Sequence, residues 1–324
     1  MLTRAQMERH QIGLYILTLI AAAICGLFAT RAVHALDHPA LFSVMIALLM
    51  YGMFTQIPFI TIKQALINRR FVAAILIANY VAVPLIVWLL CHLLPQETPL
   101  LLGVYLVLLT PCIDYVIVFT YLGRGNEKLM LLSTPVLFIT QMLLLPLYLW
   151  LFLGIEVMQI VEPAPFIQAF LIVIVLPLML AITLQWITRR NQTYQVWLDR
   201  SAWLPVPMMA LTLFVIVSSQ IGKLTAHWAL IVAVIPVYIA FMLIMPWIAR
   251  TIAYCFKLDI AASRTVIFSS STRNSLVVLP LALSLPNQWS VIVAAIIVTQ
   301  TIVELAGELV YVRLVPGFIL RDMK

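Results

Sequence analysis

The sequence predicts an all-α polytopic membrane protein with ten transmembrane helices, arranged as two inverted five-helix repeats. Three observations support this prediction: the composition, the spacing of the apolar runs, and a pattern that recurs in both halves. Of the 324 residues, 64% are hydrophobic and 10% are charged, whereas soluble domains contain about 45–50% apolar and about 25% charged residues. The chain therefore belongs in a lipid bilayer.

The apolar runs have the length of membrane-spanning helices. A helix needs about 20 mostly apolar residues to cross the hydrocarbon core. The connections between the runs are short, which leaves no room for a separate soluble domain. The predicted helices are Gln11–Ala29, Leu41–Ile62, Phe71–Leu93, Pro99–Tyr121, Leu129–Leu153, Phe166–Ile187, Ala202–Ile221, Trp228–Tyr254, Ala261–Leu285 and Trp289–Val312.

The basic residues predict the orientation. A formal charge of +7 in a membrane protein indicates basic cytoplasmic loops rather than a nucleic-acid partner. An even number of helices places both termini on one side. Apart from Arg273, which lies inside a predicted helix, only Arg31 and Lys223 fall on the opposite side. We therefore expect a multi-pass protein of the cell (inner or plasma) membrane with both termini in the cytoplasm.

The two halves of the chain share a pattern at a fixed offset. The dipeptides Thr140-Gln141 and Thr299-Gln300 are separated by 299 − 140 = 159 residues. The same offset places Pro111, Cys112 and Asp114 on Ser270, Ser271 and Arg273. We therefore predict repeats over 1–160 and 161–324. Since each contains an odd number of helices, the second is inverted relative to the first, as in many secondary transporters.

The predicted fourth and ninth helices both contain a polar interruption. Pro111 removes a backbone hydrogen bond from the fourth helix, and a cluster of hydroxyl and amide side chains occupies the middle of the ninth. We predict that both helices are broken there and cross near the middle of the membrane. The candidate helix-break residues are Pro111, Ser269 and Ser270, and the candidate substrate or coupling residues at the breaks are Cys112, Asp114, Ser271, Thr272, Arg273 and Asn274.

Opposite charges at the equivalent positions Asp114 and Arg273 suggest an ion pair. Each charge would offset much of the cost of burying the other, although such a pair need not add net stability. Its role is structural in one interpretation. In another, Arg273 occupies the place of a coupling cation, or the pair opens and closes during transport. Cys112 is either a soft ligand for thiophilic species or a small buried hydrophobic residue.

The tenth predicted helix carries Gln300, Glu304 and Glu308 on one face, because they are spaced by four residues. Two carboxylates this close in a low-dielectric environment do not both ionise easily, which suits a proton carrier. The alternative is structural hydrogen bonding to a neighbouring helix. The sequence contains no zinc-type cysteine spacing and no Gly-rich phosphate loop, and no group of residues suggests an enzyme. We expect no metal and no cofactor.

The segments "TPCIDYVIVFTYLGRGN" and "FSSSTRNSLVVLPLALSLP" resemble the bile acid:sodium symporter superfamily most closely. The resemblance extends over essentially the whole chain. Within the superfamily, the first segment and "TIVELAG" resemble the arsenical-resistance permeases. The resemblance implies a panel domain of helices 1, 2, 6 and 7 and a core domain of helices 3, 4, 5, 8, 9 and 10. It also implies thiol recognition by Cys112 and proton or substrate handling by Glu304, and it matches Asn274 to an asparagine of the ninth-helix break.

Asp114 and Arg273 depart from the pattern of those permeases. A fixed guanidinium near a sodium site would repel the ion, so this departure brings sodium coupling into question. It also leaves open an anionic substrate held by Arg273.

The leading hypothesis is a secondary active transporter that works by alternating access and exports arsenite, or a similar small oxyanion or hydroxide species, in exchange for protons. The alternative is a sodium- or proton-coupled symporter of an organic anion, as in the bile-acid branch. A second alternative is a non-transporting membrane sensor on the same fold. The expected partners are a small-molecule or ionic substrate and the lipid bilayer, with no nucleic acid, and the oligomeric state stays open.

Overall fold

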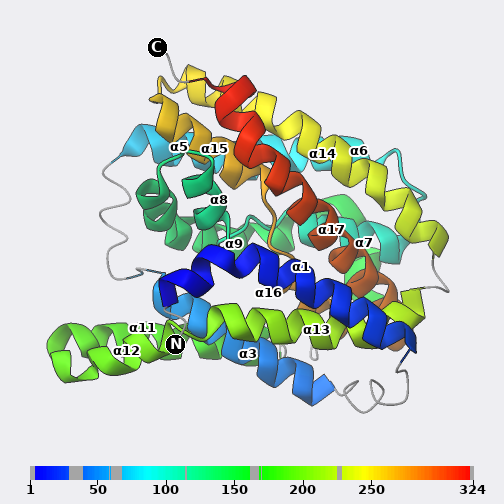
Figure 1. Cartoon of the computed structure of the whole chain (residues 1–324). Coiled ribbons are helices and arrows are strands. Elements are labelled where there is room, and N and C mark those ends of the chain that lie inside the picture. Colours follow the sequence, from blue (N-terminus) through cyan, green and yellow to red (C-terminus); the bar gives the residue numbers. More distant parts are fainter. Residues whose placement is uncertain are drawn as a thin grey trace. The chain divides into compact units, whose positions relative to one another are not determined.

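The chain divides into two compact units, both built from helices (Figure 1). The computed structural model describes residues 4–28, 39–57, 59, 68–113, 115–160, 168, 170–224 and 228–321, and these residues form helices and no strand. Unit 1 comprises Met1–Gln56, Val161–Trp228 and Leu279–Ala295, and unit 2 comprises Ile57–Ile160, Ala229–Val278 and Ile296–Lys324. The prediction of an all-α fold is confirmed, whereas the two inverted repeats and the panel and core domains stay predictions.

In unit 1, α1 packs against α13, and α3 packs against both α11 and α13. The close approach of α3 to the start of α13 depends on Gly52, because a Cβ there would lie 2.8 Å from the Cβ of Leu204. The Gln185 amide of α11 donates to the Phe54 carbonyl of α3 at 3.0 Å. The elements of this unit are α1 (Arg4–Phe28), α3 (Pro39–Gln56), η3 (Leu171–Val175), α11 (Leu176–Arg190), η4 (Gln192–Tyr194), α12 (Gln195–Ser201) and α13 (Pro205–Leu224).

Unit 2 contains the polar segments that the sequence analysis singled out. Its elements are α5 (Arg69–Ile77), η2 (Ala78–Ala82), α6 (Val83–Cys91), α7 (Thr98–Leu108), α8 (Val116–Leu122), α9 (Glu127–Ile160), α14 (Trp228–Cys255), α15 (Ile260–Ser271) and η6 (Val315–Ile319). Two further helices, α16 (Ser275–Leu283) and α17 (Asn287–Leu314), each contribute residues to both units. Within unit 2, α15 lies beside α5, α8 and α9.

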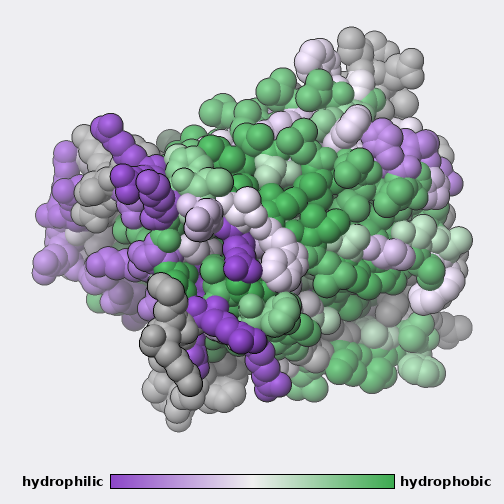
Figure 2. All heavy atoms as spheres, turned by 90° about the horizontal axis from the view of Figure 1, so that it is seen from above, coloured by the Kyte–Doolittle hydropathy of each residue, from purple (hydrophilic) through white to green (hydrophobic). Residues whose placement is uncertain are grey.

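Six helices of the described residues are long and apolar enough to cross a membrane. They are Arg69–Cys91, Glu127–Gly154, Leu171–Arg190, Gln192–Ser219, Trp228–Cys255 and Trp289–Ile319. Shorter apolar helices cover Gly13–Phe28, Ser43–Gln56 and Thr98–Leu108. Hydrophobic side chains cover much of the face in view in Figure 2, which suits contact with lipid. The chain is therefore a multi-pass membrane protein, and the count of ten spans stays a prediction.

Both predicted breaks are present. The helix α7 ends at Leu108, three residues before Pro111, and α8 begins at Val116. Proline cannot donate a backbone hydrogen bond and disfavours helical geometry in the residue before it. The second break separates α15 from α16, with Thr272 in an extended conformation (φ −100°, ψ 131°). Each predicted span is thus two short helices joined by irregular backbone.

Two boundaries differ from the sequence analysis for identifiable reasons. The predicted fifth helix ends at Leu153, whereas α9 continues to Ile160 across Gly154, whose positive φ of 74° interrupts the regular helix. The predicted seventh helix starts at Ala202, but α12 ends just before it and α13 begins at Pro205. Proline is favoured at the first position of a helix, where no backbone donor is needed.

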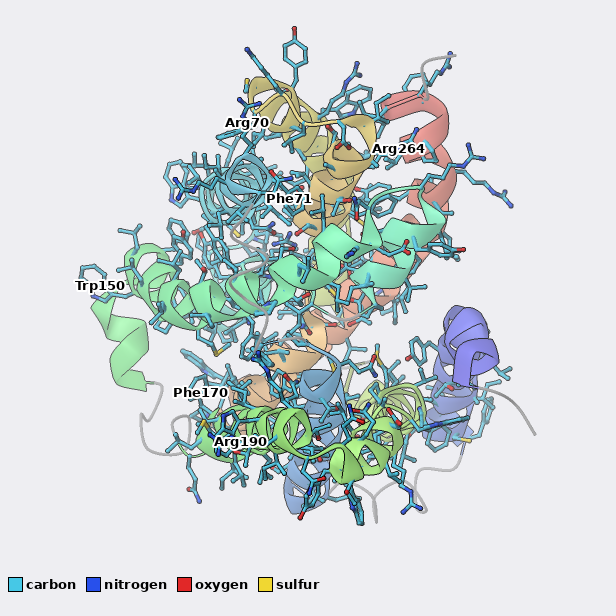
Figure 3. All side chains as sticks on the ribbon, turned by 90° about the vertical axis from the view of Figure 1, so that its left-hand side faces the viewer. Arg70, Phe71, Trp150, Phe170, Arg190 and Arg264 are labelled. Atoms are coloured by element: carbon cyan, nitrogen blue, oxygen red, sulfur yellow. The ribbon has the colours of Figure 1, made fainter. Side chains whose placement is uncertain are left out.

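Arg264 connects α15 to the C-terminal segment within unit 2 (labelled in Figure 3). Its Nε and Nη2 atoms donate to the Leu320 carbonyl at 3.1 and 2.6 Å, and Nη1 donates to the Arg124 carbonyl at 3.2 Å. The guanidinium satisfies carbonyl groups that follow the ends of η6 and α8, where no helical donor is available. Arg264 therefore fixes the first half of α15 at the end opposite the break.

We expect Gly123→Ala to destabilise unit 2. A Cβ at Gly123 would lie 2.2 Å from both Cε2 and Cζ of the Phe268 ring, and Phe268 is fully buried. Overpacking of this kind costs roughly 1–3 kcal/mol, so the midpoint of thermal unfolding in detergent should fall. Gly13→Ala is the matched control, because a Cβ there meets nothing within 4 Å. An unchanged midpoint for Gly123→Ala would contradict this packing.

Candidate functional site

The two helix breaks lie against each other and exchange backbone hydrogen bonds. The Cys112 amide donates to the Thr272 carbonyl at 3.1 Å, and the Asn274 amide donates to the Thr110 carbonyl at 2.8 Å. Pro111 and Arg273 form an isolated antiparallel bridge between them. Irregular backbone at membrane depth is tolerated where protein satisfies its polar groups. These backbone contacts satisfy polar groups of both breaks and hold them together as one structure, which we call the crossover and which comprises the described residues 109–113, 115 and 272–274.

The Arg273 side chain is completely buried beside the crossover. Its Nη1 atom donates to the Leu108 carbonyl at 3.3 Å, and Nη2 donates to the Ser269 carbonyl at 2.8 Å and to Asn79 Oδ1 at 2.8 Å. Leu108 is the last residue of α7, and Ser269 lies in the last turn of α15. Helix C-termini carry partial negative charge. Two helix ends and one amide therefore surround the guanidinium with neutral oxygen acceptors.

Asn79 belongs to the site, although the sequence analysis missed it. Besides accepting from Arg273, its side chain donates to Ser269 Oγ and to the Ile75 carbonyl, both at 3.0 Å. Asn79 lies in η2, a π-helical turn inside an otherwise α-helical span, and such turns are frequent at functional sites. A lone amide within the apolar run 71–93 was the signal that could have identified it.

Glu304 of α17 faces the crossover and is 1% exposed. Its Oε2 atom accepts from the Arg273 backbone amide at 2.7 Å and from Gln300 Nε2 at 2.5 Å. Its Oε1 atom lies 2.5 Å from the hydroxyl of Tyr115, which the sequence analysis also missed. The predicted polar face of this helix thus contacts both breaks. Tyr115 could not be distinguished in the sequence from an ordinary apolar aromatic residue.

Glu308 is held in a similar way one turn further along α17. Its Oε1 atom lies 2.7 Å from the Thr272 hydroxyl, which is also 2.7 Å from the Phe268 carbonyl. The other carboxylate oxygen has no hydrogen-bond partner among the described residues. Both acidic residues of the predicted face therefore meet a hydroxyl group that comes from one of the breaks.

The remaining predicted site residues have varied placements. Cys112 is completely buried in the first break. Asp114 lies outside the described residues, so its pairing with Arg273 stays a prediction. Asn274 Oδ1 accepts from the Val277 amide at 3.2 Å and thereby caps α16. The three serines of the last turn of α15 are also completely buried, namely Ser269, Ser270 and Ser271.

Several buried polar atoms around the crossover have no hydrogen-bond partner among the described residues. They are Arg273 Nε, Asn274 Nδ2, Gln300 Oε1 and Glu308 Oε2. An unsatisfied buried polar group costs about 1–3 kcal/mol. These donors and acceptors are therefore the groups with most to gain from a polar solute or water. Among the described residues, no group of three or more His, Cys, Asp or Glu side chains could hold a metal ion.

We expect Asn79→Leu to destabilise the protein by about 1–3 kcal/mol, because it removes an acceptor from the buried Arg273 guanidinium. The matched control is Gln141→Leu, which removes a fully buried amide whose two polar atoms have no hydrogen-bond partner among the described residues. The midpoint of thermal unfolding in detergent should fall for the first variant and not for the second. Equal loss in both would show that Arg273 does not depend on Asn79.

Comparison with known families places the chain among transporters. Residues 43–243 match the family described as "Sodium Bile acid symporter family", which is 201 of the 324 residues. The matched range includes the first break and ends before the second break and α17. A comparison with curated proteins finds no match. Because the family match covers more than half of the chain, this protein belongs to the sodium bile acid symporter family of transporters.

Proposed function

We propose that this protein is a proton-coupled secondary active transporter, in which the crossover binds the substrate and Glu304 carries the proton. The observation that most supports this proposal is the position of the Glu304 carboxylate, which bonds to the backbone of the second break and meets Tyr115 of the first. A change in its protonation acts directly on both broken segments. Alternating access is the usual cycle of transporters with such discontinuous helices.

Proton coupling is supported by the type and burial of the acidic residues. Ionisable side chains at membrane depth are costly and commonly mark proton relays. Glu304 and Glu308 are both buried on one face of α17. The part of the structure that is described shows the Glu304 carboxylate bonded to Gln300, Tyr115 and the backbone, rather than to a guanidinium. It is therefore free to exchange a proton without breaking a salt bridge.

The position of the Arg273 guanidinium supports a transport cycle that does not use sodium. In transporters with broken helices, unwound carbonyls and helix C-terminal ends coordinate the coupling cation. Here two such carbonyls, from Leu108 and Ser269, accept from the Arg273 guanidinium. The side chain thus supplies a tethered positive charge to oxygen atoms of the type that would bind sodium.

The substrate that we propose is arsenite or a similar small hydroxide species, moved out of the cell. The support is Cys112, whose thiol is buried at the crossover and whose sulfur suits thiophilic species. An organic anion is less well supported. Each bidentate face of a guanidinium uses Nη2, and both Nη2 hydrogens have acceptors in Asn79 and Ser269.

Transport should be driven by a pH gradient in sodium-free medium and should be lost in Glu304→Gln. The substitution keeps the size of the side chain and removes the exchangeable proton. The measurement is arsenite movement in proteoliposomes with an imposed pH gradient, with Glu97→Gln as the control, because Glu97 is an exposed carboxylate at the start of α7. An absolute requirement for sodium, or full activity of Glu304→Gln, would contradict proton coupling through this residue.

Cells that lack their own arsenite exporter should retain less arsenic when they express the wild-type protein, and Cys112→Ala should remove most of this effect. Cys255→Ala is the control, because that thiol is exposed at the end of α14. Surface expression of each variant is measured in parallel. Equal export by Cys112→Ala would exclude the thiol from recognition, and no export by the wild type would exclude arsenite as the substrate.

A further inference from the structure

We propose that Tyr115 is a positioning residue that transmits the protonation state of Glu304 to the backbone of the second helix break. This inference rests on the proposed role of Glu304 as the proton carrier. The inference concerns how a proton on Glu304 changes the crossover, rather than whether Glu304 binds the proton.

Two acceptors of the described residues lie within reach of the Tyr115 hydroxyl. It lies 2.5 Å from Glu304 Oε1 and 3.0 Å from the Arg273 carbonyl oxygen. A phenol has a single hydrogen to donate, and a backbone carbonyl can only accept. Both contacts can be hydrogen bonds at the same time only if Glu304 carries a proton on Oε1 and donates it to Tyr115.

The partners of the other carboxylate oxygen assign the proton to Oε1. Glu304 Oε2 accepts from the Arg273 backbone amide and from the Gln300 amide. A proton on Oε2 would be unfavourable, because two N–H donors already point at this oxygen. Among the described residues, Oε1 neighbours the Tyr115 hydroxyl, which can either donate or accept.

Two hydrogen-bond arrangements follow. With Glu304 ionised, the Tyr115 hydrogen goes to Oε1, and the Arg273 carbonyl lacks this donor. When Oε1 gains a proton, that proton is donated to the Tyr115 oxygen, and the Tyr115 hydrogen turns to the Arg273 carbonyl. One proton enters, no covalent bond to Tyr115 breaks, and the hydroxyl reverses its direction.

The reversal acts where the two breaks are joined. The Arg273 carbonyl belongs to the peptide unit whose nitrogen is the Asn274 amide, and that amide donates to the Thr110 carbonyl of the first break. Adding or removing a donor at one end of a peptide unit changes the strength of the hydrogen bond at its other end. Protonation of Glu304 therefore alters the link between the broken helices.

A second hydroxyl, that of Thr272 immediately before Arg273, has the same kind of arrangement. Thr272 Oγ1 lies between Glu308 Oε1 and the Phe268 carbonyl, with both distances 2.7 Å. Two acidic residues on one helix thus each meet a hydroxyl that is shared with a backbone carbonyl. Among the residues that the structure describes, the titratable and charged groups that face Glu304 are Tyr115, Arg273 and, on its own helix, Glu308 and Tyr311.

Infrared difference spectroscopy between two pH values tests this inference on the full-length protein in liposomes, with no substrate added. We expect a carboxylic acid band that disappears in Glu304→Gln, together with a change in a tyrosine C–O band. The protein contains 11 tyrosines, so Tyr115→Phe identifies the source of the second band. In Tyr115→Phe the tyrosine change should vanish, and the acid band should move to higher frequency because it loses its acceptor.

Tyr238→Phe is the matched control, because that buried hydroxyl donates to the Ile296 carbonyl; it should retain both bands. A carboxylic acid band that responds to pH without any tyrosine change would overturn the role of Tyr115 and leave proton binding by Glu304 intact. A tyrosine change that persists in Tyr115→Phe would also overturn it. The absence of any titrating band assigned to Glu304 would overturn both this inference and the proposed function.

Discussion

Burial of the Arg273 guanidinium is the constraint on which the rest of unit 2 depends. A positive charge at membrane depth is stable only where good hydrogen-bond acceptors replace the water that it loses on burial. The acceptors are the end of α7, the end of α15 and the amide of Asn79. Both helices must therefore stop near this side chain, and the π-helical turn η2 must present Asn79 to it. The helix breaks and the buried charge require each other.

The backbone of the crossover connects this charge to the acidic face of α17. Arg273 uses its guanidinium for the helix ends, while its backbone amide and carbonyl meet Glu304 and Tyr115. One residue thus links a fixed positive charge with a carboxylate that can gain or lose a proton. In the cycle that we propose, the positive charge of Arg273 would stay in place, and the negative charge of Glu304 would be the one that changes.

The sequence was sufficient for those features that depend on composition and local chemistry. Pro111 and the run of polar residues from Ser269 to Asn274 predicted both breaks, and the spacing of Glu304 and Glu308 predicted a shared face. Acceptors supplied by backbone carbonyls, such as Leu108, carry no signal in the side-chain sequence. Tyr115 was missed because an aromatic residue in an apolar run usually contributes only packing.

The central claim is that the Arg273 guanidinium takes the place of a sodium ion. The most direct test is equilibrium binding of radioactive sodium to the purified wild-type protein in detergent, over a range of sodium concentrations. We expect no saturable binding, because the Arg273 guanidinium donates to the carbonyl oxygens of Leu108 and Ser269, which we propose take the place of sodium ligands. A dissociation constant within the range of physiological sodium concentrations would contradict this, since an ion could not bind stably beside a buried guanidinium on the same acceptors.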